Sequence, residues 1–192
     1  MKYSTMKIYS VEVDSNKCQW IMPYVDDEVI LNLLTFDCHP KVDTWINTRW
    51  YPFNPKEEVR NFFSLGTNGA FAFDEKVYKS DLFTLLEMAG EIIPINFSEQ
   101  RLYVSNVLVC VNALNENNTE WDLYDDGSKG KIIKYSFYPD RISESSLFKI
   151  PETSKSEILT YSGIKDSVDE FKAIYEYNNF TGLIFNEIYS RT

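Results

Sequence analysis

The apolar run at residues 102–111, LYVSNVLVCV, constrains the fold of this chain more than any other part of its sequence. A short run that is rich in Val, Leu and Tyr and is bounded by turn residues is typical of a β-strand buried on both faces. A helix that spans a membrane needs about 20 apolar residues, and this run is much shorter. We therefore expect a core strand here.

The segment before this strand, residues 80–90, predicts a helix with a marked start and end. Ser80 is expected to cap the exposed amides of the first turn, and Gly90 is expected to take the left-handed conformation after the last turn. The apolar side chains of this segment share one helical face and should lie on the core strand. They are Leu82, Leu85, Leu86 and Ala89.

Hydrophobic patterns elsewhere in the chain predict shorter elements. The expected strands are residues 6–13, 18–22, 70–73, 131–138, 147–151, 157–161 and 181–188. Residues 163–177 have apolar side chains at helical spacing, whereas residues 29–34 are compatible with either a buried strand or a helical turn. We therefore expect an α+β fold in a single domain over residues 1–192, with a mainly antiparallel mixed sheet and two or three packed helices.

An aromatic segment, Trp45, Trp50, Tyr51 and Phe53, is interrupted by two prolines. Pro52 and Pro55 are expected to exclude a regular helix or a central strand there, because proline cannot donate a backbone hydrogen bond. Residues 55–58 are typical of a first helical turn. Packing in the core is the expected role of at least two of these aromatic side chains, and an exposed binding surface is the alternative.

The chain is acidic, with a formal net charge of −10 spread over both halves. Charge of this sign repels nucleic acids and anionic membranes, which attract clusters of Lys and Arg instead. It favours association with a basic macromolecule. We therefore expect neither a nucleic-acid partner nor a membrane partner, while binding to a basic protein is compatible with the composition.

Few residues could carry catalysis or bind a metal. The single histidine, His39, directly follows Cys38, and side chains that are adjacent in sequence usually diverge. No Gly-x-Ser-x-Gly segment is present. Cys18 and Cys110 lie far from Cys38, which is typical neither of a disulfide framework nor of a zinc site. The sequence therefore predicts no catalytic residue, no metal and no cofactor.

The N-terminal residues 1–6, MKYSTM, lead directly into an alternating segment. They lack the apolar central region of a secretory signal peptide. Together with the absence of a disulfide framework, this favours a cytoplasmic location.

Two acidic segments are the candidate partner-binding residues. The first is Asp26, Asp27 and Glu28, and the second, within the polar residues 115–130, is Trp121, Asp122, Tyr124, Asp125 and Asp126. A solvated turn is the simplest interpretation of either segment. Aromatic side chains beside acids are also what a protein-binding hot spot requires. As a further alternative, carboxylates of this kind act as acid–base pairs or hold a cation.

The order of several short motifs in the second half of the chain resembles a known family. These are the Gly90-Glu91 turn with Pro94, the strand at residues 102–107, VNALN at 111–115, LFKIP at 147–151, and FTGLIF at 180–185 after a helix. The succession resembles the Imm11-type (DUF1629) family of bacterial immunity proteins. The resemblance covers residues 80–189, and residues 1–75 are less distinctive. Asn112 and Asn115 stand where the family often has Asp.

The resemblance implies an immunity protein that binds and neutralises a cognate secreted toxin without chemistry of its own. Members of this family are encoded beside polymorphic toxins, and the acidity of this chain would suit a basic toxin domain. The motifs are of a kind that determines the fold, so no binding residue carries over from them. The alternative is a small enzyme or ligand-binding domain with a carboxylate-lined cleft, and a third possibility is a structural or oligomerising domain. A deep pocket with convergent acids would favour the cleft, and a shallow acidic surface would favour protein binding.

Overall fold

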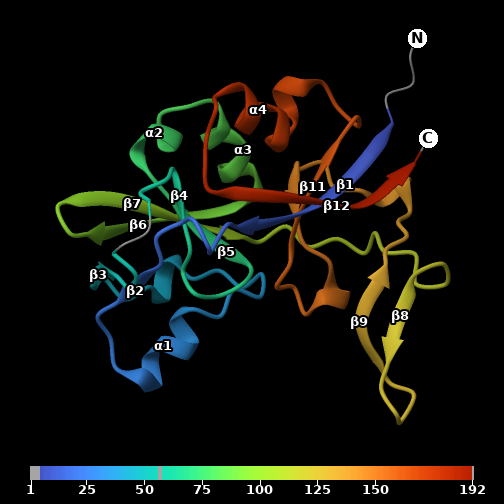
Figure 1. Ribbon diagram of the computed structural model, residues 1–192, viewed down its shortest axis with the longest axis horizontal. Helices are drawn as coiled ribbons and strands as arrows, with labels where there is room; N and C mark the ends of the chain where they lie inside the picture. Colours follow the sequence, from blue (N-terminus) through green and yellow to red (C-terminus); the bar gives the residue numbers. More distant parts are fainter. Residues whose placement is uncertain (1–4, 56–57, 192) are drawn as a thin grey trace.

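A computed structural model describes residues 5–55 and 58–191 of the chain (Figure 1). These residues form an α+β domain, as the sequence predicts, with twelve strands and with four α-helices where two or three were expected. The strands belong to sheets of six, four and two strands. Residues 1–4, where no signal peptide is expected, and residues 56–57 of the predicted helical turn lie outside the described residues.

The six-stranded sheet has the predicted core strand in its interior. Its strand order is β2 (Ile21–Pro23), β3 (Arg49–Pro52), β6 (Gly90–Phe97), β7 (Gln100–Val107), β5 (Ala70–Phe73) and β4 (Phe62–Phe63). All neighbours are antiparallel except β3 and β6, which are parallel. Residues 102–107 are buried, because β6 and β5 flank β7 and apolar clusters cover both faces of the sheet.

The core strand is shorter than the apolar run predicts. It ends at Val107, after which the amides of Leu108 and Val109 both donate to the carbonyl of Ala89 at the end of a helix. The backbone of Cys110 then forms an isolated parallel β-bridge with Lys149, which follows the strand at 147–148. The final apolar residues of the run therefore connect the two large sheets instead of extending β7.

The four-stranded sheet joins the two ends of the chain. Its order is β10 (Leu147–Phe148), β11 (Ile158–Ser162), β1 (Met6–Val13) and β12 (Leu183–Arg191), all antiparallel. β1 lies between β11 and β12. A strand from the N-terminal residues 1–75 therefore completes a sheet whose other three strands come from the second half of the chain. The four strands predicted at these positions are present, which is why the chain forms one unit.

Three helices cover the upper side of the sheets in Figure 1, and one lies below. They are α1 (Asp27–Leu33), α2 (Glu75–Tyr78), α3 (Leu82–Ala89) and α4 (Phe171–Tyr177), with short 3-10 turns at Val42–Thr44, Pro139–Arg141, Pro151–Thr153 and Ser167–Asp169. The ambiguous segment at 29–34 is helical. The helix predicted over 163–177 begins only at Phe171, and Val168 is exposed instead of facing the core.

Helix α3 buries the four predicted side chains, but both of its predicted caps are wrong. The Ser80 hydroxyl donates to the carbonyl of Val77, so it closes α2 instead of capping α3. Gly90 has a φ of 170°, which is extended backbone, and it is the first residue of β6. The helix therefore passes directly into a strand without a left-handed residue.

The aromatic segment contains a strand that the prolines were expected to exclude. β3 lies between β2 and β6, which contradicts the prediction that no central strand forms here. The reason is that only Arg49 and Trp50 pair with β6, while Pro52 at the strand's end pairs with Ile21 of β2. Trp50 is buried and stacks on the partly buried Trp45, as expected for core packing.

The polar residues 115–134 form a hairpin of β8 (Glu120–Leu123) and β9 (Lys129–Lys134), where we expected turns followed by a strand over 131–138. This two-stranded sheet pairs with neither of the larger sheets. It extends from the body of the molecule in Figure 1.

Candidate functional site

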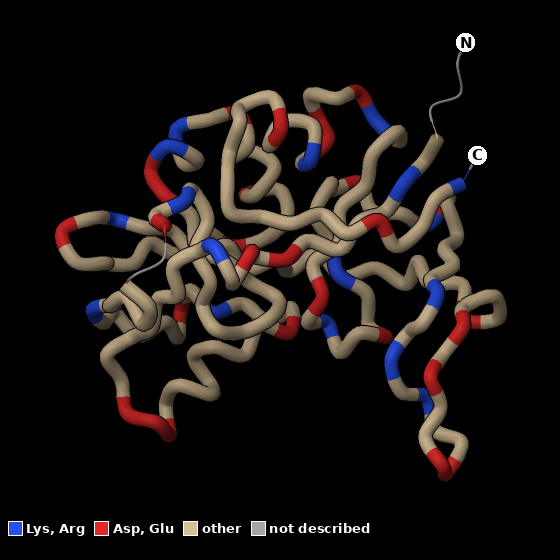
Figure 2. The backbone as a smooth tube through the Cα atoms, in the orientation of Figure 1, with Lys and Arg blue, Asp and Glu red and all other residues tan. Residues whose placement is uncertain are grey.

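The two predicted acidic segments lie on two projections of the molecule. Asp26 is the N-cap of α1, Asp27 and Glu28 lie in its first turn, and all three are exposed. The second segment is on the β8–β9 hairpin, where Asp122, Tyr124, Asp125 and Asp126 are exposed. Both projections extend toward the lower edge of the view, near opposite ends of the long axis, and Figure 2 shows acidic positions at both tips.

The tip of the hairpin has a defined conformation. The amide of Tyr124 donates to the carbonyl of Ser128 at 3.0 Å, and the amide of Gly127 donates to Tyr124 at 2.8 Å. The carboxylate of Asp126 accepts hydrogen bonds from both the hydroxyl and the amide of Ser128, which lower the pKa of Asp126. The tip therefore presents the ionised carboxylate of Asp126 on an ordered turn.

The aromatic side chains of the hairpin have different roles. Trp121 is partly buried against the apolar cluster below the four-stranded sheet, with the Lys129 ammonium 4.7 Å from its ring centroid. Tyr124 is exposed, by 64 %. Two further apolar side chains, Leu123 and Ile133, are exposed by 60 % and 65 %. These two were not predicted as binding residues, because alternation in so short a segment does not show which face is buried.

A cleft of about 690 Å³ lies between the hairpin and the body of the molecule. Its lining includes residues 130–132 of β9, residues 66–71, residues 11–13 of β1, and residues 152–154 and 156–158 in and after the turn that follows β10. A second hollow of about 430 Å³ shares Gly66, Thr67, Asn68, Ser154 and Ser156 with it and reaches residues 34–37, just after α1. The two hollows adjoin, and we call them together the trench.

Three carboxylates line the cleft: Glu12, Glu152 and Glu157. The hydroxyl of Tyr135 donates to Glu157 at 2.7 Å, while burial raises the pKa values of both groups. One oxygen of Glu152, Oε2, is shielded from water and has no hydrogen-bond donor in the described part of the chain. None of the three forms an ion pair with a described residue. Lys131 of β9 also lines the cleft, so the described lining carries three carboxylates and one ammonium group.

The cleft residues were not predicted from the sequence. Glu12 lies on β1, Tyr135 follows β9, Glu152 lies in a 3-10 turn, and Glu157 precedes β11. No local spacing connects these four positions, because only the tertiary fold brings them together. The one available signal was Glu12, a charged residue on the polar face of a strand that alternates.

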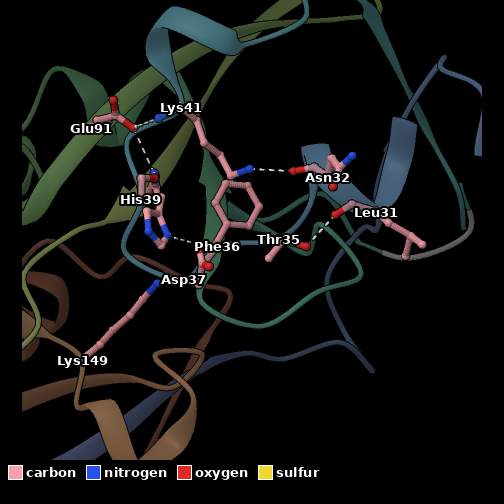
Figure 3. Close-up of polar contacts among 10 residues, drawn as sticks. Leu31, Asn32, Thr35, Phe36, Asp37, His39, Lys41, Glu91 and Lys149 are labelled. Carbon is pink, nitrogen blue, oxygen red and sulfur yellow. Dashed lines mark hydrogen bonds and ion pairs between the residues drawn. The ribbon is translucent and has the colours of Figure 1, made fainter. Parts of the chain in front are cut away.

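The loop at residues 36–41 contributes Phe36 and Asp37 to one wall of the trench, and it is held from both sides (Figure 3). The carboxylate of Glu91 accepts the amides of Lys41 at 2.8 Å and Val42 at 3.2 Å. From the other side, the ammonium of Lys149 donates to the carbonyl of Phe36 at 2.8 Å. Lys149 is fully buried, and burial lowers its pKa to about 8. This loop is therefore a fixed wall that connects the two large sheets.

The sequence predicted no catalytic or metal-binding role for the single histidine and the three cysteines, and their positions in the structure are as follows. His39 is exposed, and its Nδ1 lies 2.9 Å from a carboxylate oxygen of Asp37. No disulfide joins Cys18, Cys38 or Cys110, all of which lie within the described residues. Over residues 5–55 and 58–191, no group of three or more His, Cys, Asp and Glu side chains is placed to hold a metal ion.

The fold and the site together define an acidic α+β domain with two acidic projections and a carboxylate-lined trench. No family model matches the sequence, and no curated protein is significantly similar to it, so the resemblance to immunity proteins stays a prediction. None of the described helices has the length and apolar character that crossing a membrane requires.

Proposed function

We propose that this protein is an immunity protein that binds a basic toxin domain through its two acidic projections and the trench. The observation that carries the proposal is the placement of the acids. All six predicted carboxylates are exposed, and they belong to two projections that extend toward the same edge of the molecule. The trench reaches from the end of α1 to the hairpin, so a partner seated there can contact both projections.

The chemistry of this surface suits capture of another protein. A net charge of −10 attracts a basic partner and accelerates encounter by electrostatic steering. Leu123, Tyr124 and Ile133 supply exposed apolar area within the acidic surroundings of the hairpin. The protein would act by covering the active site of the toxin in the cytoplasm of the producing cell, without catalysing a reaction.

Charge reversal at the hairpin tip is expected to slow association at least about tenfold at low salt. The variant is Asp122→Lys, Asp125→Lys and Asp126→Lys. The partner is the variable C-terminal domain of a secreted protein encoded beside the gene for this chain, co-purified with it and studied by stopped-flow fluorescence. Because the effect is electrostatic, added salt should remove most of the difference between variant and wild type.

The matched control reverses three exposed acids outside both projections: Asp81 and Glu87 at α3, and Asp166 before the 3-10 turn Ser167–Asp169. It changes the net charge by the same amount but leaves the projections intact. If both triple variants slow association equally, the effect comes from the net charge alone and the projections have no specific role in binding. Absence of any complex with the neighbouring domain would contradict the proposed function itself.

A ligand-binding domain is the second candidate, and the cleft favours it. A volume of about 690 Å³ is typical of small-molecule sites, and Glu157 beside Tyr135 is a polar pair of the kind that orients a ligand. If this function holds, a cationic metabolite is expected to raise the melting temperature of the wild type by several degrees. The Glu157→Gln variant should lose that shift in differential scanning fluorimetry. A screen without such a compound would count against the ligand-binding function.

A further inference from the structure

One wall of the cleft is an unpaired strand edge. β9 pairs with β8 on one side, and no described strand pairs with it on the other. Residues 130–132 of β9 line the cleft, so the strand borders this cavity. An unpaired strand edge offers backbone N–H and C=O groups to any extended chain that lies beside it.

Carboxylates line the same cavity. Glu152 and Glu157 lie on the segment between β10 and β11, and both belong to the lining of the cleft. Among residues 5–55 and 58–191, Glu157 accepts one hydrogen bond, from Tyr135, and Glu152 Oε2 has no donor although it is shielded from water. A buried acceptor without a donor costs free energy, and an incoming cation would satisfy it.

We propose that the cleft is a strand-addition site for an extended segment of the partner that carries Lys or Arg. The segment would pair its backbone with β9 and place a cationic side chain against Glu152 and Glu157. This inference rests on the proposed function and names the part of the partner that the cleft receives.

The dimensions and periodicity of a strand fit this occupant. β9 has six residues, and an added strand of similar length spans about 20 Å. Side chains of a strand alternate between its two faces, so every second one points the same way. A segment with Lys or Arg at alternate positions therefore presents its charges on one face, while its backbone pairs with β9.

The probe is a capped octapeptide with alternating Lys and Val, titrated into the full isotope-labelled chain and followed by NMR. We expect the largest amide shifts at residues 130–132. The same peptide with N-methyl groups on alternate backbone amides should bind at least about tenfold more weakly, because it cannot complete a strand ladder. An alternating Glu–Val peptide should not bind.

Variants of the chain separate charge from folding. Glu152→Gln with Glu157→Gln is expected to weaken the Lys–Val peptide about tenfold, since charge-assisted hydrogen bonds become neutral ones. The matched control is Glu87→Gln, an exposed acid on α3 outside the cleft, which should leave the affinity unchanged. The backbone amide spectrum of each variant verifies that it is folded.

The outcomes distinguish this inference from the proposed function. If the toxin domain forms a complex but the Lys–Val peptide neither shifts residues 130–132 nor competes, strand addition is wrong and the proposed function stands. If the peptide binds as expected but no toxin complex forms, the strand-addition site stands and the immunity function fails. Equal affinity of the N-methylated peptide would overturn strand addition, because attraction of charges alone would then explain binding.

Discussion

A Gly90→Ala variant is expected to be less stable than the wild type by about 4 kcal/mol or more. A Cβ at this position would lie 2.0 Å from the carbonyl oxygen of Asn106 and 2.7 Å from the amide nitrogen of Leu108. Both are backbone atoms, so no side-chain rotation relieves the overlap. β6 and β7 would have to separate where Gly90 pairs with Val107.

The separation would reach further than one pair. The side chain of Asn106 donates to the carbonyl of His39 and to the carboxylate of Glu91, both at 2.9 Å. Moving this residue therefore disturbs the loop that forms one wall of the trench. Urea denaturation followed by circular dichroism measures the loss of stability, and a total stability of about 5–15 kcal/mol makes it readily detected.

The matched control is Gly127→Ala at the tip of the hairpin. Gly127 has a φ of +80°, which alanine adopts at a cost of about 1 kcal/mol, but no atom lies within 4 Å of its added Cβ. The Gly127→Ala substitution therefore introduces backbone strain without steric overlap. The Gly90→Ala substitution introduces steric overlap without such strain, because the backbone of Gly90 is extended. A Gly90→Ala protein within about 1 kcal/mol of the wild type would show that the close approach of β6 and β7 is not required.

The elements that the sequence predicts well are those with a strong local pattern. The buried part of β7 follows from its apolar composition, and the inward face of α3 follows from the spacing of its leucines. The exposed state of the acids at residues 26–28 and 122–126 also follows from their chemistry. Each of these predictions depends only on residues within one short segment.

The predictions that fail depend on partners distant in sequence. Position 90 requires glycine because the backbone of Asn106 on the neighbouring strand leaves no room for a Cβ, and not because α3 ends there. A helix-capping rule considers only residues near in sequence, so it cannot predict this contact. β3 is an interior strand because Pro52 lies beyond the residues that pair with β6. The carboxylates of the cleft come from β1, from the 3-10 turn after β10 and from the residue before β11, so only the fold brings them together.

A Lys149→Ala variant is expected to lose about 4 kcal/mol of stability, because it removes a buried side chain and leaves the Phe36 carbonyl without its donor. Lys149 is fully buried and connects β10 to the loop at residues 36–41 through that bond. Lys149→Met is the matched comparison. Methionine retains most of the volume of the lysine side chain. The smaller loss of stability expected for this variant therefore reflects only the hydrogen bond and the buried charge.

The buried charge should appear as a pH dependence with a defined sign. Burial lowers the pKa of Lys149 from 10.5 to about 8 in the folded protein. Below pH 8 Lys149 is protonated in both the folded and the unfolded protein, and burying its ammonium group lowers the stability of the folded state. As pH rises from 8 to 10.5 the unfolded state binds more protons, so the wild type should gain up to about 3 kcal/mol relative to Lys149→Met.

The neighbouring thiol acts in the opposite direction and must be removed from the measurement. Burial raises the pKa of Cys38 from 9.0 to about 11, so above pH 9 the unfolded state loses the thiol proton first and stability falls. Both proteins are therefore compared in a Cys38→Ala background by urea denaturation from pH 7 to pH 10.5. A stability difference that does not change over this range would mean that Lys149 keeps its ordinary pKa in the fold. The fold would then carry no free-energy cost for burying the ammonium.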